Sequence, residues 1–198
     1  MIKELLLSQL ISESKWAQIV DKFTANELCS LLSYESNMTL AYDLFFKNLE
    51  NFEIQDFAVR LFFSISENFR EWNSEWKTDA FLGNLCSITW KYDEMYELYK
   101  KAYEKCDDPP DSLLLLLAGC NSVPGSPPIT DQEAEEYLNE AVKKRETYEA
   151  AIMMRGLAKD KGFKDQELYW NNKCLELEEK NVHTEPIIPD VLTAQNRK

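Results

Sequence analysis

The chain has 198 residues, of which 44% are hydrophobic and 29% are charged, a composition typical of one folded domain or one short helical array. It contains only 5 glycines and 7 prolines, and this scarcity of turn-forming residues argues against a β-sheet protein. Its 35 acidic and 22 basic residues give a net charge of -13, which argues against nucleic acid or an anionic membrane as a partner.

The acidity is spread along the chain, because the first 75 residues carry 6 basic and 12 acidic residues and the remainder carries 16 and 23. An acidic surface favours solubility, and it also favours fast capture of a basic protein partner, so we keep both interpretations. The 5 cysteines are odd in number and lie mostly among apolar residues, which is typical of reduced thiols in a core. With no signal peptide evident, we expect a cytoplasmic protein.

Residues 1–75 are predicted to form four or five helices. Thr24-Ala-Asn-Glu27 has the sequence of a capping box, which marks a helix start. Apolar residues recur at helical spacing in 16–23, 40–49 and 57–69. We interpret residues 1–75 as the N-terminal helical segment of the same domain, formed either by degenerate repeats or by a helical cap.

A repeat begins near Trp76. The repeat is indicated by four short segments: Phe81-Leu-Gly83, Tyr92-Asp-Glu-Met95, Tyr99-Lys-Lys-Ala102 and Asp107-Asp-Pro109. This segment resembles one tetratricopeptide repeat, a pair of helices of about 34 residues. The physical reason for the pattern is packing, since its glycine and alanine are small where two helices cross closely, and its tyrosines fill the gap to the next repeat.

Two looser copies follow, at Ser112–Thr147 and Tyr148–Lys180. The first contains a second capping box, Thr130-Asp-Gln-Glu133, after a segment at 122–128 whose three prolines and glycine exclude a helix. The resemblance therefore covers residues 76–180. It implies an all-α fold, a right-handed α-solenoid of antiparallel helix pairs with about 9–11 helices. The tail at 181–198 is expected to be extended and to lie against the body through its apolar residues, Ile187, Ile188 and Leu192.

Catalytic motifs are lacking in the sequence. Its one histidine, His183, lies in the tail, and no motif supports a nucleophilic pair of Cys120 with it. Neither the C-x-x-C nor the H-x-x-x-H spacing of a metal site occurs, and the glycines are too isolated for a phosphate-binding loop. We therefore expect a protein that is not an enzyme and that uses no metal and no cofactor.

Binding to another protein is the function that the sequence favours. Stacked helix pairs form a concave surface lined by the first helix of each repeat, and the resemblance places Asn84, Ser87, Cys120 and Met153 near it. In place of the cations that clamp a chaperone tail, the second copy has leucines at 113–117, which argues against that ligand. Four further carboxylates are candidates for binding a basic partner by imitating phosphates: Asp107, Asp108, Glu135 and Glu136.

Two functions follow from these features. The first is an acidic immunity or inhibitor protein that binds and neutralises a basic toxin, such as a nuclease; the chain resembles all-helical bacterial immunity proteins in broad outline. The alternative is a tetratricopeptide-type adaptor or secretion chaperone that binds a peptide in its groove. A homodimer through the end of the solenoid, near Tyr169 and Trp170, is also compatible with the sequence.

Overall fold

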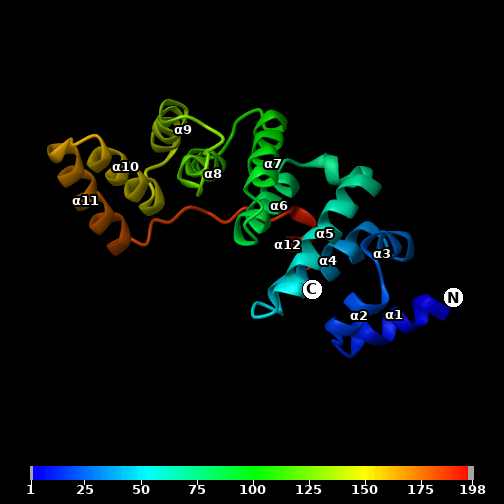
Figure 1. Ribbon diagram of the computed structural model, residues 1–198. Coiled ribbons are helices and arrows are strands. Elements are labelled where there is room, and N and C mark those ends of the chain that lie inside the picture. Colours follow the sequence, from blue (N-terminus) through cyan, green and yellow to red (C-terminus); the bar gives the residue numbers. More distant parts are fainter. Residues whose placement is uncertain (1, 196–198) are drawn as a thin grey trace. The chain divides into compact units, whose positions relative to one another are not determined.

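The structure is a computed structural model that describes residues 2–195 (Figure 1). This part of the chain forms 12 α-helices and two short 3-10 helices, without a strand, which confirms the all-α class. These 12 α-helices are one more than the upper end of the expected range of 9–11, because the tail ends in a short helix that the sequence did not predict. No helix among the described residues is both long and apolar enough to span a membrane.

The chain divides into two compact units, and the division falls between residues 91 and 92 and again between 187 and 188. Unit 1 holds α1 (Ile2–Ser12), α2 (Trp16–Lys22), α3 (Ala25–Leu31), α4 (Tyr34–Phe46), α5 (Phe52–Asn68), a 3-10 helix (Arg70–Ser74), α6 (Lys77–Ile88) and α12 (Asp190–Gln195). Unit 2 holds α7 (Tyr92–Lys105), α8 (Asp111–Gly119), a 3-10 helix (Cys120–Ser122), α9 (Asp131–Lys144), α10 (Tyr148–Asp160) and α11 (Lys164–Glu179).

The core of unit 1 lies between α4, α5 and the start of α6. Phe62 of α5 contacts Phe81 of α6 edge to face, with 5.6 Å between the ring centroids. The indole N–H of Trp72 donates to Asp79 Oδ1 at 2.9 Å, and the hydroxyl of Thr78 donates to the Trp72 carbonyl at 2.8 Å. All three polar partners are buried, so these bonds satisfy groups that burial would otherwise leave unpaired. They fix the turn that precedes α6.

Unit 2 is a row of helices that pack against their neighbours in chain order, α8 with α9 and α10 with α11 (Figure 1). Its centre is an apolar cluster, here called the central cluster, formed by Leu114, Leu115, Ala118, Leu138, Ala141 and Ala150. Three of the six are alanines, whose small side chains let helix backbones approach closely. This sequential pairing is consistent with a solenoid, while the right-handed tetratricopeptide geometry stays a prediction.

Local signals in the sequence located several helix boundaries correctly. Both predicted capping boxes are present, and in each the threonine hydroxyl accepts the N–H of the glutamate three residues later. Of the segment predicted at 122–128, residues 123–128 form no helix, as the prolines required, whereas Ser122 ends the 3-10 helix Cys120–Ser122. In the tail, Ile187 and Leu192 are buried as expected. The predicted domain boundaries at 75 and 180 stay predictions.

The capping box at α9 gives a direct test of the local contribution to stability. Thr130→Ala removes the acceptor for the Glu133 N–H, so we expect the free energy of unfolding to fall by about 1 kcal/mol. Urea denaturation followed by circular dichroism measures it. Ser126→Ala, in the exposed loop before α9, is the matched control and should leave the midpoint unchanged. Equal midpoints for the two variants would show that the cap does not stabilise α9.

Candidate functional site

Two adjoining hollows lie over α9, α10 and the start of α11 in unit 2, with volumes of about 320 and 200 Å³. Both are lined by Glu135 and Leu157, so we treat them as one surface, the α9–α10 groove. Met153 lines one hollow, and Met154 and Trp170 line the other. The apolar part of the lining thus includes one methionine in each hollow, a side chain that adapts its shape to different ligands.

Polar side chains border the groove. Glu135 of α9 forms an ion pair with Lys161, at the end of α10, and this pair stands where the two hollows meet. Gly156 of α10 lines the smaller hollow, and a Cβ added there would meet no atom within 4 Å. The missing side chain at this position thus helps to keep the groove open. A groove lined by both apolar and polar side chains suits a peptide or a protein segment.

The structure brings together two of the predicted site residues, since Glu135 and Met153 both line the smaller hollow. Asn84 and Ser87 lie on α6, in unit 1, and both are partly buried. They thus belong to the other unit of the chain, and their role in binding stays a prediction.

The remaining predicted residues lie outside the α9–α10 groove. Asp107 and Asp108 are exposed in the turn between α7 and α8, and Asp108 forms an ion pair with Lys144. Glu136 is exposed on α9 and accepts a hydrogen bond from the side-chain amide of Gln132 at 2.9 Å. All three are accessible to a partner, and their role in binding stays a prediction.

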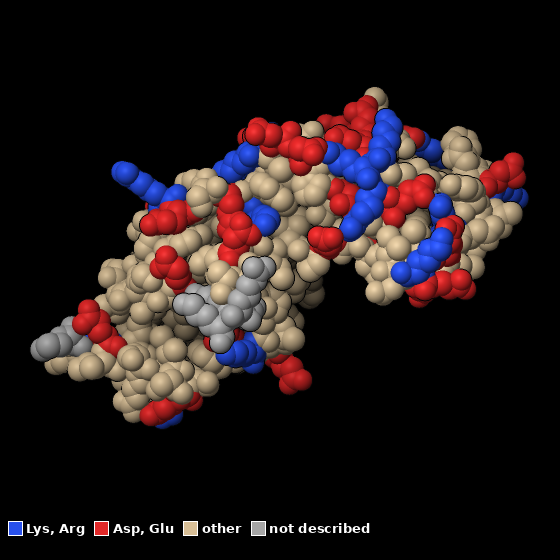
Figure 2. All heavy atoms as spheres, turned by 180° about the vertical axis from the view of Figure 1, so that it is seen from behind, with Lys and Arg blue, Asp and Glu red and all other residues tan. Residues whose placement is uncertain are grey.

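Unit 2 carries most of the excess negative charge. Its residues 92–187 include 21 acidic and 12 basic side chains, a net charge of -9 out of -13 for the whole chain. On the face drawn in Figure 2, basic side chains lie among many of the acidic ones. Three glutamates of α9 occupy one side of the helix and form no ion pair with any described residue: Glu133, Glu136 and Glu140.

A larger hollow, of about 520 Å³, lies in unit 1 between α1, α3 and α4. Leucines such as Leu7 and Leu40 form its floor, and serine and threonine side chains form much of its rim. Of its two acidic residues, Asp43 already pairs with Lys47 at 2.8 Å. This hollow therefore offers volume but little charge for recognising a partner.

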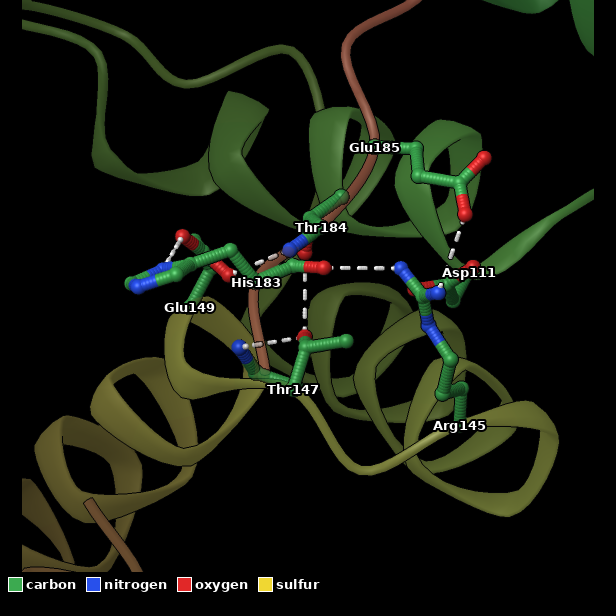
Figure 3. Close-up of polar contacts among 8 residues, drawn as sticks. Asp111, Arg145, Thr147, Glu149, His183, Thr184 and Glu185 are labelled. Carbon is green, nitrogen blue, oxygen red and sulfur yellow. Dashed lines mark hydrogen bonds and ion pairs between the residues drawn. The ribbon is translucent and has the colours of Figure 1, made fainter. Parts of the chain in front are cut away.

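The densest polar network of unit 2 attaches the tail to the junction of α9 and α10 (Figure 3). The Arg145 guanidinium donates through Nη2 to the His183 carbonyl at 2.9 Å. It also forms ion pairs with Asp111 at 3.2 Å and with Glu185 at 3.3 Å. One arginine thus joins the start of α8 to two residues of the tail, which holds the tail in place.

Glu149, at the start of α10, completes this attachment (Figure 3). One carboxylate oxygen contacts His183 Nδ1 at 2.9 Å, and the other accepts the Thr184 N–H at 2.8 Å. Burial alone would raise the pKa of Glu149, but the Thr184 N–H and the His183 ring outweigh it and hold the pKa below its ordinary value. Each group of this network is engaged in holding the tail, so we interpret it as structural. Its partners lie more than 30 residues apart in sequence, and no local pattern could have predicted them.

The chain's candidate nucleophile is buried. Cys120 is inaccessible, and its thiol donates to the Leu116 carbonyl at 3.4 Å. Burial raises the pKa of Cys120 to about 12, whereas a nucleophilic cysteine needs a lowered pKa. Within residues 2–195, no three His, Cys, Asp or Glu side chains are grouped so that they could hold a metal ion.

Comparison of the chain with protein-family models, with curated proteins and with solved structures finds no match. The function therefore has to be argued from the chemistry of the described surfaces.

The attachment of the tail should depend on pH in a way that follows from Glu149. Because its pKa is lowered in the folded state, its contribution is complete above the ordinary value of about 4.3 and is lost as the pH falls through the lowered value. Hydrogen exchange should show the Thr184 amide protected at about pH 6 and progressively less protected as the pH falls below the ordinary carboxyl value, after correction for the intrinsic rate.

Glu149→Ala should leave the Thr184 amide unprotected throughout this pH range. The Val182 amide, which donates to the Leu177 carbonyl at 2.9 Å, is an internal control and should stay protected throughout. Protection of Thr184 that survives in this variant would contradict the role assigned to Glu149.

Proposed function

We propose that the protein binds another protein, and that its partner is basic, as expected for a toxin that an acidic immunity protein covers and neutralises. The observation that carries this proposal is the net charge of -9 on unit 2, together with the side of α9 where Glu133, Glu136 and Glu140 form no ion pair with a described residue. Hydrogen bonds from Thr130 lower the pKa of Glu133, so its carboxylate is charged at neutral pH.

Charge of this kind acts mainly on the rate of encounter. An acidic surface attracts a basic partner over a distance set by salt, and it repels nucleic acid. Carboxylates that are already paired with lysine or arginine contribute little to this attraction. The electric fields of unpaired carboxylates on one side of a helix add together and strengthen it. The proposal therefore predicts fast association that slows steeply when salt is added.

The test combines partner capture with charge variants. Proteins retained from the native lysate at low salt are identified by mass spectrometry, and the association rate of the purified partner is then measured at about 0.05 and about 0.5 M salt. We expect a basic partner whose association slows at least about tenfold. Replacing Glu133, Glu136 and Glu140 by glutamine should reproduce much of this slowing at low salt.

The matched control removes the same charge from unit 1, by glutamine at the exposed residues Glu50, Glu53 and Glu67. It should slow association less than the α9 variant does. Glutamine also serves at the third position of a capping box, so the α9 variant should keep its helix start. Retention of clients that are not basic and that stay bound at high salt would contradict the proposal.

A second candidate function, an adaptor or secretion chaperone, is favoured by the α9–α10 groove. The apolar part of its lining, with a methionine in each hollow, suits an extended or helical segment of a client protein. Binding there would depend on buried apolar area, and hence little on salt.

Filling the groove tests this alternative. Gly156→Leu places a side chain where no atom lies within 4 Å of the Cβ, so we expect the fold to remain intact and groove binding to be lost. Gly156→Ala is the control, because it should keep the groove largely open while stabilising α10 by about 0.5–1 kcal/mol. Thermal melts and affinity for the captured client measure both effects. Unchanged client affinity in Gly156→Leu would exclude the groove as the binding site.

A further inference from the structure

Three tyrosines share a surface of unit 2 outside the α9–α10 groove. Tyr103 of α7 contacts Tyr137 of α9 edge to face, with 5.7 Å between the ring centroids. Tyr96 lies seven residues before Tyr103 and therefore on the same side of α7. Burial raises the pKa of the Tyr137 phenol, and Tyr103, Tyr96 and Glu133 nearby raise it further, which places these groups close together. We call Tyr96, Tyr103 and Tyr137 the tyrosine face.

The rings of the tyrosine face contribute to packing within unit 2, but its hydroxyl groups take no part in the fold. Tyr103 and Tyr137 pack against the central cluster, and all three tyrosines are only partly buried. None of the three hydroxyls forms a hydrogen bond with a described residue. A leucine or phenylalanine would fill the same space in the core. Tyrosines with accessible rings and unused hydroxyls are typical of protein interfaces.

Charged side chains around the tyrosine face are mostly acidic. Glu133 and Glu140 lie four residues before and three residues after Tyr137, so they flank it on α9. On α7, Asp93 and Glu97 are exposed near Tyr96. One cation, the exposed Lys100, lies between Tyr96 and Tyr103 on the same side of the helix. These five groups carry a net charge of -3, and none of them forms an ion pair with a described residue, although the charge of Glu140 helps to raise the pKa of the nearby Lys144.

We propose that the tyrosine face binds an arginine-rich segment of the partner protein. This inference rests on the proposed function and names the chemistry of the partner's contact. A guanidinium group is planar, so it stacks on a tyrosine ring while its N–H groups donate to a neighbouring carboxylate. The ammonium group of lysine carries the same charge but is not planar, so it does not stack on the ring in this way. The face thus selects arginine over lysine, whereas charge attraction alone does not.

The experiment uses the full chain and two defined probes, a short fluorescent peptide of alternating arginine and glycine and its lysine counterpart. Fluorescence anisotropy at low salt measures both affinities. We expect the arginine peptide to bind about five to ten times more tightly than the lysine peptide. Tyr103→Leu, which keeps apolar bulk but removes the ring, should reduce that ratio to about one, and Tyr103→Phe should restore most of it.

Two further variants keep the test independent of core packing. Lys100→Gln removes an exposed cation and should tighten binding of both peptides. Tyr169→Leu, an exposed tyrosine of α11 in the same unit, is the matched control and should leave the arginine preference unchanged. Loss of the preference in Tyr169→Leu, or weaker binding in Lys100→Gln, would overturn the assignment to the tyrosine face.

The outcomes separate this inference from the proposed function. Equal, salt-sensitive binding of both peptides would overturn the tyrosine face and leave a basic partner as the function. Failure of both peptides to bind at low salt would count against both. An arginine preference that follows Tyr103 supports both.

Discussion

The central cluster is the interaction on which the surfaces of unit 2 depend. Leu138 and Ala141 of α9 pack between the leucines of α8 and Ala150 of α10, and these residues are almost fully buried. Because one side of α9 is buried in this cluster, the rotation of the helix about its axis is fixed, and so are the directions in which its other side chains point. Met153 and Leu157 cover one edge of the cluster and line the α9–α10 groove, while Tyr103 and Tyr137 cover another.

The two surfaces that flank the cluster offer different chemistry. Apolar and polar side chains both line the groove, and its central charges, Glu135 and Lys161, neutralise each other. The tyrosine face is aromatic, and the carboxylates beside it form no ion pair with a described residue. An apolar groove binds by burying area, whereas an acidic aromatic face binds by charge and stacking. The sensitivity of binding to salt therefore distinguishes the functions that the two surfaces support.

The tail shows how a segment without much secondary structure is held in a defined place. Residues 183–185 are attached by Arg145 and Glu149, two long side chains that project from the junction between α9 and α10. The tail also satisfies the Tyr148 N–H at the start of α10, through the Val182 carbonyl at 2.9 Å. The tail is thus part of unit 2 up to Ile187, which is itself buried.

By itself, the sequence determined the features that depend on neighbouring residues. Helical spacing of apolar residues specified the all-α class, and the threonine–glutamate pairs at Thr24 and Thr130 specified two helix starts, because both signals act within one or two turns. The tetratricopeptide resemblance led to Met153 and the argument from acidic charge led to Glu135, and the structure places both in one groove. Only the tertiary structure decided the groove itself, the attachment of the tail and the contact of Tyr103 with Tyr137. These features join residues from different helices, and their distances are set by packing rather than by spacing along the chain.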